Sequence, residues 1–507
     1  MTMLTDESLE FAKEHITKYY DSDFFPKPFE FDAIWFSWAE VKKELTSRNI
    51  NKLSPKIPNT LTSMKPKGGF RVVHQLDPLD TIIYTAMAYM VALPIEQARI
   101  SLDQHVACSY RFEIANGSFF SKGNGFVEFS DKSELLAKKY KYILTADITD
   151  FYNQIYLHRL NNAIACADNN LVGLSDDIEK FISKLNSKAS QGIPVGPAAS
   201  IVMAEAIMID IDEFLREKDV FHTRYVDDFR IYSDSKEQLV DVLEDLTLYL
   251  YTTHRLTLVS DKTKILESEK YISEILHNQY QLERVELFHR LEILNSYSGE
   301  LDVLDIPIED EDVKSEKQLE ILIEKVLEKK TLDLGMARAL FRKAKKYNYI
   351  SMLEQVFDNF EFFVPVINDL CLYLRSVTNE EFVKEWKQEL IQLTKSTAMD
   401  RKLVRFWFEW YVSTSAELLD VIELKKFVYQ GSNIVNKAQA SITSKNISWV
   451  RTNKNQINNV GNWERRAIVR STQILAKDER EPYLNLFETV TPEFLDKLIA
   501  KWVKSIS

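Results

Sequence analysis

Glycine and proline are unevenly distributed along this chain of 507 residues, and their distribution limits what each part can fold into. Only three of the 12 glycines and three of the 13 prolines lie in residues 317–507. Leu, Lys and Glu dominate there, and segments such as "LEILIEKVLEKK" place apolar residues at helical spacing. We therefore predict an all-α domain over residues 317–507. Its sequential helices can stack as a solenoid, although the residues show no clear repeat period.

The preceding part of the chain has a different character. Up to about residue 300, segments such as "KPKGGF" and "QGIPVGP" separate mixed helix and strand patterns, which predicts an α+β fold. The acidic stretch that follows, "ELDVLDIPIEDEDVKSE", has the composition of an exposed connection. The expected organisation is an N-terminal helical segment, an α+β region, an acidic connection and a helical domain, over residues 1–54, 55–300, 301–316 and 317–507.

Composition narrows the class of protein. A chain of this length exceeds what one core supports, so two or three domains are expected, and 45% hydrophobic with 12% aromatic residues indicate a folded protein. The formal net charge of -12 argues against nucleic-acid binding by the chain as a whole, but it leaves room for a local basic groove. The three cysteines lie far apart without a C-x-x-C pair, which favours a reduced, cytoplasmic protein with neither a disulfide framework nor a zinc knuckle.

No segment predicts a membrane anchor. The N-terminal residues "MTMLTDESLEFAKEH" have no apolar signal core. The most apolar run, "TIIYTAMAYMVAL" (81–93), is too short to span a bilayer and is predicted to form a buried helix. We therefore expect a soluble protein without a membrane partner.

Two adjacent aspartates, Asp227 and Asp228, interrupt the segment "FHTRYVDDFRIYSDS" (221–235) between two runs rich in β-branched and aromatic residues. Such runs predict a hairpin with the aspartates at or near its turn. Two like charges side by side raise each other's pKa unless a cation lies between them. A solvated turn would also explain the pair, so a functional interpretation needs partners elsewhere in the chain.

Asp147 is the first such partner. "YILTADI" predicts a buried strand ending in Asp147, and an aspartate at the carboxyl edge of a strand can face a neighbouring hairpin. Three aspartates on adjacent strands can hold two Mg²⁺ ions about 4 Å apart, as in-line nucleotidyl transfer requires. Because neighbouring strand residues point to opposite sides, we expect Asp147 and Asp227 to ligate directly and Asp228 less directly. A strand-end cap is the alternative role for Asp147.

Three further segments supply candidate nucleotide contacts. "MKPKGGFRVVHQLDPLD" (64–80) has the form of a basic hairpin with a Gly-Gly turn, which can fold over a triphosphate. "SQGIPVGPAASIVMAEAIMIDIDEFL" (190–215) is a tight loop before a long amphipathic helix, and its glycines let backbone approach a nucleotide. Lys262, in "LTLVSDKTKIL", lies near the end of a predicted strand, where it can protonate pyrophosphate. Taken singly, these segments also fit an exposed hairpin, a turn and a surface lysine.

In order and rough spacing, these pieces resemble the fingers and palm motifs of reverse transcriptases. The likeness covers about residues 55–270 and runs through the basic hairpin, "ADITDFY", "SQGIPVGP", "YVDD" and "LTLVSDKTKI". It implies that residues 55–300 form the fingers and palm. The implied catalytic and metal-binding residues, for two Mg²⁺ ions or alternatively Mn²⁺, are Asp147, Asp227 and Asp228, with the carbonyl of Ile148.

The same resemblance implies a nucleotide pocket. Lys65 and Arg71 would hold the triphosphate, with Lys262 as the candidate acid, and Gln191 would lie at the pocket. Tyr152 falls at the steric-gate position, where a bulky ring clashes with a 2′-hydroxyl and favours dNTPs as substrates.

Within reverse transcriptases, the chain is similar to the bacterial abortive-infection group. The wider likeness covers nearly the whole chain and is carried by "SDFFPKPFEF", "CSYRF" (108–112), "DITDFYNQIYLHRL" and "GNWERRAIVRSTQILAKDERE". It implies a HEAT-like helical domain in place of a thumb and a closed homo-oligomer, expected to be a trimer. It further implies a role in protecting bacteria against phage, which a gene carried on a prophage can also encode. It also implies untemplated DNA synthesis from a protein tyrosine, with a single-stranded DNA product that is covalently attached. We find no endonuclease motif after the palm, which argues against a role in intron mobility.

Tyr20 and Tyr19, in "HITKYYDSDFF", are the candidate priming residues. The Ser and Asp residues beside them predict a loop that can reach the palm, and a phenol is acidic enough for metal activation. Packing of the two rings at a helix end is the simpler alternative.

The helical domain carries a local basic bias. From Gly431 to Trp463 there is no acidic residue, and Trp449 and Trp463 can stack on bases. The candidate DNA contacts in and after this run are Lys437, Lys445, Arg451, Lys454, Arg465, Arg466 and Arg470. We interpret them as a groove for the product strand, with a solvated helix face and core tryptophans as the alternative.

Two other functions stay open. A reverse transcriptase that reads a bound RNA template would share every palm motif. A non-enzymatic phage sensor or toxin built on a palm scaffold is the second, and the intact aspartates at 147, 227 and 228 argue against it.

Overall fold

The computed structural model describes residues 2–20, 24–123, 125–277, 319–320 and 322–506. The predicted acidic connection, residues 301–316, lies outside the described residues. Internal contacts divide the chain into two compact units. Unit 1 comprises Met1–Ser22, Lys42–Asn59 and His74–Ile306, and unit 2 comprises Asp23–Val41, Thr60–Val73 and Pro307–Ser507. Because two N-terminal segments group with the C-terminal helices, these units do not follow the predicted boundaries, and the four-part organisation stays a prediction.

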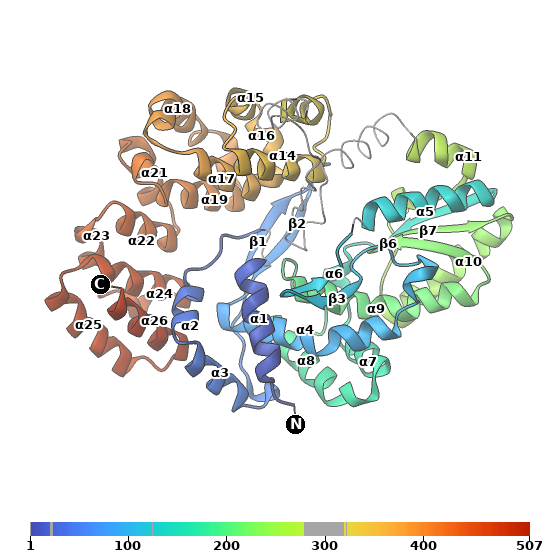
Figure 1. Ribbon diagram of the computed structural model, residues 1–507, viewed down its shortest axis with the longest axis horizontal. Coiled ribbons are helices and arrows are strands. Elements are labelled where there is room, and N and C mark those ends of the chain that lie inside the picture. The colour runs from blue at the N-terminus through green and yellow to red at the C-terminus, as the bar shows by residue number, and fades with distance from the viewer. Residues whose placement is uncertain (1, 21–23, 124, 278–318, 321, 507) are drawn as a thin grey trace. The chain divides into compact units, whose positions relative to one another are not determined.

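Unit 1 is built on a four-stranded antiparallel sheet with the strand order β6-β7-β5-β8 (Figure 1). The sheet strands are β5 (Tyr142–Asp147), β6 (Phe221–Tyr225), β7 (Asp228–Ser233) and β8 (Lys264–Glu267), and a separate hairpin consists of β3 (Phe112–Ala115) and β4 (Ser118–Phe120). The helices are α1 (Asp6–Lys18), α4 (Pro78–Ala98), α5 (Gly125–Lys139), α6 (Phe151–Gln154), α7 (Leu157–Ala167), α8 (Val172–Leu185), α9 (Ala198–Glu217), α10 (Lys236–Tyr249) and α11 (Ser268–Tyr271).

Both faces of this sheet are covered. Ile143 of β5 and Tyr232 of β7 are register partners, and they pack in one cluster with Leu136 of α5. Their strand neighbours Leu144 and Ile231 are also fully buried, and neighbouring strand residues point to opposite faces. The predicted strand ending in Asp147 and the predicted hairpin around residues 226–227 are therefore both present in a two-sided core.

Two apolar helices form much of the remaining core of unit 1. The run at 81–93 lies in α4, where Asp77 caps the first turn and most side chains are buried, as the sequence predicts. Among the described residues, α4 is also the one helix long and apolar enough to cross a membrane, and 72% of that stretch is buried inside the protein. It therefore serves as a core helix. Helix α4 continues past Pro94 to Ala98, further than the apolar run itself.

Two local predictions differ from the structure. Helix α9 was predicted to be amphipathic, but every residue from Ala198 to Met208 is buried, because α4, α7 and β6 all contact it. The helical pattern after Asp147 is divided into α6 and α7 by a break at Ile155 and Tyr156. The break lets Tyr156 pair with Gln191 of the Gly/Pro loop.

Unit 2 contains a stack of helices, and its described residues from 319 to 506 include no strand, which confirms the predicted all-α region. Its helices are α2 (Glu30–Phe36), α14 (Leu334–Tyr347), α15 (Leu353–Asp358), α16 (Phe360–Phe363), α17 (Ile367–Val377), α18 (Glu380–Leu393), α19 (Lys402–Ser413), α20 (Ala416–Leu419), α21 (Ile422–Gln430), α22 (Ile434–Thr443), α23 (Ile447–Asn453), α24 (Asn462–Ser471), α25 (Lys477–Val490) and α26 (Phe494–Ser505), and α3 (Trp38–Thr46) spans the boundary between the units.

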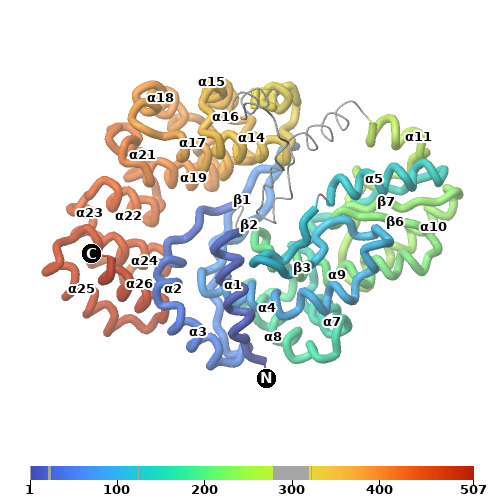
Figure 2. The backbone as a smooth tube through the Cα atoms, in the orientation of Figure 1, coloured from blue at the N-terminus to red at the C-terminus, as the bar shows by residue number. Residues whose placement is uncertain are grey.

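The long helices of unit 2 pack in chain order. Helix α14 contacts α17, which contacts α19, and the series continues through α22 and α24 to α26, as the backbone trace shows from yellow to red (Figure 2). Helix α2 packs on α26 at the end of this series. The buried Trp407 of α19 donates its indole N–H to the carbonyl of Phe24 at 2.7 Å. The solenoid-like order agrees with the expected HEAT-like arrangement.

The predicted Gly-Gly hairpin is formed by β1 (Asn59–Met64) and β2 (Phe70–Gln75), most of which belongs to unit 2. The Lys65 N–H donates to the carbonyl of Gly69 at 3.1 Å. Gly68 and Gly69 have φ values of 85° and 76°, a backbone region that glycine adopts readily.

Candidate active site

Strand pairing brings two of the predicted catalytic aspartates together. Asp147 is the last residue of β5 and Asp228 is the first residue of β7, and the two are direct register partners in the antiparallel pair. Partners across antiparallel strands project to the same face of the sheet. The two carboxylates therefore share one face at the end of the β5–β7 pair.

Asp227 lies in the turn between β6 and β7, beside this pair. The N–H of Ile148, directly after Asp147, donates to the carbonyl of Asp227 at 3.3 Å. Desolvation, followed by the negative charge of Asp147, raises the pKa of the half-buried Asp227 to about 7. An aspartate that resists ionisation at neutral pH is poorly hydrated and has too little positive charge around it to offset that burial.

The other two aspartates each have a cationic partner. The Lys262 ammonium lies 2.6 Å from Oδ2 of Asp147. Lys262 ends a short 3-10 helix (Ser260–Lys262) just before β8 begins. Burial raises the pKa of Asp147, and Lys262 opposes this shift. The Arg230 guanidinium binds both carboxylate oxygens of Asp228. Asp228 is therefore already engaged, in line with the less direct role expected for it.

Arg230 was not anticipated from the sequence. Two residues after Asp228 on β7, it lies on the same face of the strand, donates to the Tyr271 hydroxyl at 3.1 Å and stacks over the Phe129 ring. Burial works to lower the pKa of Arg230, but the Asp228 carboxylate outweighs it and raises that pKa. The sequence could have indicated this contact, because residues two apart in a strand point to the same face.

The donor set suits a hard divalent cation. Among the described residues, no three His, Cys, Asp or Glu side chains are arranged as ligands of one cation. Mg²⁺ needs only one or two protein carboxylates when substrate phosphates complete its coordination. Burial, and then the charge of Asp147, raise the pKa of Asp227, and a cation between the two carboxylates would remove their repulsion. These residues therefore fit the expected metal.

The Gly/Pro loop meets the predicted steric-gate segment. The Ile193 N–H donates to the carbonyl of Tyr152 at 3.0 Å, and the Gln191 amide donates to the side chain of Gln154 at 2.6 Å. Gly192 has φ +91°, and a side chain there would lie 3.2 Å from the carbonyl oxygen of Asn153. The structure thus brings Gln191 and Tyr152 onto adjoining backbone, as a common pocket requires.

Other predicted residues are not brought to the aspartates by described contacts. Lys65 and Arg71 are exposed on the β1–β2 hairpin and belong to unit 2, so their triphosphate role stays a prediction. Tyr19 follows the end of α1, where its ring lies 5.6 Å from the His15 ring, and Tyr20 comes next. Both are half-buried, and priming by either stays a prediction.

The predicted DNA-binding run requires a correction. The run lacks acidic residues in the sequence only, because one acid from a later helix folds against it and a second pairs with the arginines that follow it. Glu479 of α25 pairs with Arg451 at 2.7 Å and Lys454 at 2.6 Å, and these cations lower the pKa of Glu479 to about 2. Asp496 of α26 pairs with Arg465 at 2.6 Å and Arg466 at 3.3 Å.

Arg466 is 1% exposed at its side chain, so it is a core residue and not a surface contact for DNA. Arg470 donates to Gln439 at 2.8 Å and stacks over Phe29. Of the predicted set, Lys445 is exposed and Lys437 is half-buried. The available cationic surface is therefore smaller than the sequence predicts.

Residues 64–284 match the family model described as reverse transcriptase (RNA-dependent DNA polymerase). This range contains both β5 and the β6–β7 hairpin, and so all three aspartates. The chain contains a reverse transcriptase domain. A reverse-transcriptase-type nucleotidyltransferase fold, followed by a helical region, is therefore what the sequence encodes, as predicted.

Solved structures similar to this reverse-transcriptase-containing chain include two telomerases. Telomerase from Candida albicans, in complex with a TWJ fragment of telomeric RNA, shares 12% identity, with a TM-score of 0.30 and coverage of 75% of this chain and 71% of that chain. Apo telomerase from Candida tropicalis shares 12% identity, with a TM-score of 0.34 and coverage of 83% and 74%. No curated protein sequence matches the chain. The domain assignment therefore rests on the family match.

Proposed function

We propose that the chain is a DNA polymerase of bacterial antiphage abortive infection, which adds dNTPs without a template from a protein tyrosine. The observation that carries the nucleotidyl-transfer part is the cross-strand pairing of Asp147 with Asp228 beside Asp227. The antiphage part, the protein primer and the absence of a template are supported by the likeness to the abortive-infection group alone.

Asp147 and Asp227 would hold two Mg²⁺ ions, with Mn²⁺ as the alternative, and the Ile148 carbonyl would assist. Bound divalent ions acidify the attacking hydroxyl and neutralise charge on the leaving pyrophosphate. In the transfer, the hydroxyl oxygen bonds to the α-phosphorus, loses its proton, and the bond from that phosphorus to the bridging oxygen of pyrophosphate breaks. The Lys262 ammonium, with its side chain 62% exposed, can turn from Asp147 and give a proton to that oxygen.

The substrate pocket is proposed to lie beside α6. Tyr152 would exclude a 2′-hydroxyl, and Gln191, held by Gln154, would line the base side. Lys65 and Arg71 would bind the triphosphate.

The decisive test of untemplated synthesis is incubation of the purified protein with each dNTP and Mg²⁺ and with no nucleic acid. Protein-linked DNA that resists separation under denaturing conditions is expected. The matched control is Asp227→Asn, which should give none. Synthesis that depends on added template and primer would reject untemplated activity but leave the polymerase assignment standing.

The matched family's own description favours one second candidate, an RNA-templated reverse transcriptase. In that case RNA co-purifies with the protein, added RNA directs the product sequence, and the product carries a free 5′ end. Sequencing the product and labelling its 5′ ends separates the two functions.

The priming residue is tested by digesting the adduct with nuclease and protease and locating the nucleotidylated peptide by mass spectrometry. Tyr20 is expected to carry the nucleotide, and Tyr20→Phe should remove it. A nucleotide on Tyr19 or another tyrosine would reject Tyr20 while preserving protein priming.

The cellular role is tested by phage plating on bacteria that express the chain in the cytoplasm. Protection is expected with the parent protein and is expected to be lost with Asp227→Asn. Protection that survives this substitution would favour the non-enzymatic sensor. The proposed assembly is a homotrimer, which light scattering of the purified protein measures directly.

A further inference from the structure

Val226, the residue before Asp227, adopts an unfavourable backbone conformation. Its φ is 59°, in the left-handed region. Valine is β-branched, and for such residues a positive φ is a genuine outlier that persists only where neighbouring groups hold it. The residue sits in the turn that carries the proposed metal ligand, so what holds Val226 also sets the place of Asp227.

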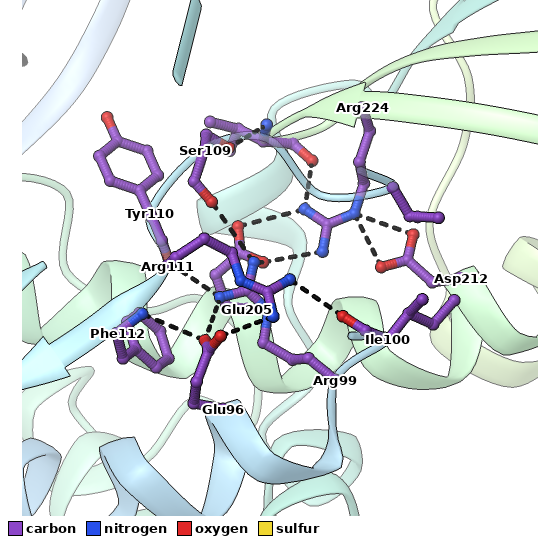
Figure 3. Close-up of polar contacts among 12 residues, drawn as sticks. Glu96, Arg99, Ile100, Ser109, Tyr110, Arg111, Phe112, Glu205, Asp212 and Arg224 are labelled. Carbon is purple, nitrogen blue, oxygen red and sulfur yellow. Dashed lines mark hydrogen bonds and ion pairs between the residues drawn. The ribbon is translucent and has the colours of Figure 1, made fainter. Parts of the chain in front are cut away.

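Two side chains hold the peptide groups on either side of Val226. The hydroxyl of Ser109 accepts a hydrogen bond from the Val226 N–H at 2.8 Å. The guanidinium of Arg224 donates to the Val226 carbonyl at 3.0 Å. Because one bond fixes the peptide before Val226 and the other fixes the peptide after it, both φ and ψ of this residue are set. Figure 3 shows Ser109 and Arg224 among the side chains of this region.

Ser109 and Arg224 are linked to each other through a shared set of buried ion pairs and hydrogen bonds. Arg224 is fully buried, and it binds both oxygens of Asp212, at 2.9 and 3.0 Å, and Glu205 at 2.8 Å. Glu205 also pairs with Arg99 at 2.9 Å, and Arg99 donates to the carbonyl of Ser109 at 3.3 Å. A single carboxylate on α9 therefore connects the Ser109 side to the Arg224 side (Figure 3).

The charges of this network balance within the protein, although Nε of Arg99 and Nε of Arg111 are buried without a hydrogen-bond partner among the described residues. Arg111 pairs with Glu96 at 2.6 Å, and Glu96 also binds Arg99, so three arginines face three carboxylates. A charge-balanced buried cluster has no need of a ligand, and it is suited to fixing geometry. It also accounts for the "CSYRF" segment (108–112), to which the proposed reaction assigns no chemical step.

The far side of the turn is fixed as well. The Val226 carbonyl belongs to the peptide bond that supplies the Asp227 nitrogen. The Asp227 carbonyl accepts from the N–H of Ile148, next to Asp147. Asp227 is thus held between the network and the end of β5.

We propose that Ser109 and Arg224 are positioning residues that place Asp227 by holding Val226 in its left-handed conformation. The inference rests on the proposed function, because it concerns the geometry of a nucleotidyl-transfer site. Both residues are fully buried, so neither is exposed to contact substrate. Without them Val226 relaxes toward negative φ, and the Asp227 carboxylate moves away from Asp147.

Ser109→Ala removes the acceptor with little change in volume and tests the proposal. We expect nucleotide addition to fall about tenfold to a hundredfold, since the turn amide loses its acceptor. We also expect the Mg²⁺ concentration for half-maximal rate to rise, because one ligand is displaced. Mn²⁺ binding, measured by EPR with a non-hydrolysable deoxynucleotide analogue, should weaken in parallel and reports independently of turnover.

The sharper readout is rescue by a second substitution. Glycine adopts positive φ without strain, so Val226→Gly should restore much of the activity and metal affinity that Ser109→Ala removes. A merely structural role of Ser109 in its own loop predicts no such rescue. Should Ser109→Ala fail to fold, Ser109→Cys keeps the volume, offers only a weak acceptor, and is expected to show the same metal defect and the same rescue.

Ser118→Ala is the matched control, because Ser118 is also buried and also accepts a backbone N–H, that of Phe120, at 3.1 Å. It should lower thermal stability comparably and leave metal dependence unchanged. The inference is overturned if Ser109→Ala matches the parent in rate and Mn²⁺ binding, or if Val226→Gly gives no rescue. A parent protein that binds Mn²⁺ but adds no nucleotide rejects the proposed function alone; a parent that does neither rejects both.

Discussion

Asp212 and Asp227 lie in the same unit, but their pKa values shift in opposite directions from the ordinary value of an aspartate. Asp212 on α9 is only 2% exposed, and its burial alone would raise its pKa. The charge of Arg224, with the His222 hydrogen bond, outweighs burial and lowers the pKa to about 2. Asp227 is less buried, yet desolvation and the charge of Asp147 raise its pKa to about 7.

The difference shows that counter-charge, and not depth of burial, decides which carboxylate is structural and which is available. Around Asp212 the protein supplies the neutralising cation itself. Around Asp227 it places another carboxylate nearby, and Lys262, which pairs with that carboxylate, offsets the negative charge only in part. A site of the second kind favours a cation from solution, which is the physical basis for assigning it as the candidate active site.

The largest expected effect is on nucleotide addition. Asp227→Asn should lower the rate by about a thousandfold or more, because it removes a charge on which the metal depends. The variant should keep its fold, since the substitution removes a negative charge that is offset only in part. Radiolabelled dNTP incorporation and circular dichroism measure the two outcomes, and Asp147→Asn should behave alike. Normal incorporation by both variants would remove the site assignment.

Asp212→Asn should act on stability. Arg224 would keep Glu205, which binds both of its terminal nitrogens, but would lose the Asp212 carboxylate at its Nε–H while staying buried, which costs about 3–5 kcal/mol in free energy of unfolding. Asp210→Asn is the control on the same helix, where the exposed Asp210 pairs with His254, and a loss below about 1 kcal/mol is expected. Urea unfolding of the parent and both variants measures these values. Equal losses would show that the Arg224 network does not stabilise the unit.

The pH dependence of stability should differ in sign between the two aspartates. The pKa of Asp227 is raised in the folded state, from 3.8 to about 7, so its contribution is fully present below pH 3.8 and is lost as pH rises to about 7. The contribution of Asp212, whose pKa is lowered to about 2, is present above pH 3.8 and is lost as pH falls toward about 2.

In metal-free buffer, the free energy of unfolding of Asp227→Asn should therefore gain on the parent by on the order of 1–3 kcal/mol between about pH 4 and about pH 8. Denaturant titrations at several pH values measure the gain. A constant difference across this range would show that the Asp227 pKa is not raised.

The sequence correctly predicted the strands and the hairpin that carry Asp147, Asp227 and Asp228. Asp147 ends a strand, Asp228 begins one and Asp227 lies in the turn before it, and the alternation and β-branched residues of these strands specify hairpin and register. Short-range pattern is enough there, because each strand carries its own period.

The buried ion-pair network around Asp212 and Arg224 was not predicted, because only tertiary contacts bring its residues together. Arg224 appears in the sequence as one charged residue in a strand, and its partners Glu205 and Asp212 appear as polar positions of a helix that was expected to be amphipathic. Ser109 lies 117 residues before Val226. For the same reason, the sequence around residues 431–470 could not show that Glu479 and Asp496 neutralise basic residues there.

A smaller effect is expected at the proposed steric gate. Tyr152→Val should lower discrimination against rNTPs by about tenfold to a hundredfold, because the ring is proposed to fill the space of the 2′-hydroxyl. Phe151→Leu is the control at the neighbouring, buried ring and should leave sugar selection unchanged. Competition between dNTP and rNTP measures the ratio. An unchanged ratio in Tyr152→Val would exclude it as the gate.

The smallest effect is expected in the helical unit, where a cation that is already paired within the protein should contribute less to DNA binding than an unpaired one. Arg451 is already neutralised by Glu479, whereas Lys445 is exposed and has no side-chain ion pair among the described residues. If the helical unit binds the product strand, Lys445→Ala should lower affinity for single-stranded DNA and reduce the salt slope by up to about 0.7. Arg451→Ala should change both less and cost little stability, as the loss of an exposed ion pair does. Fluorescence anisotropy over a range of salt concentrations measures both variants. A larger loss with Arg451→Ala would mean that DNA displaces Glu479 from this arginine, and pairing within the protein would then be no guide to which cations are available.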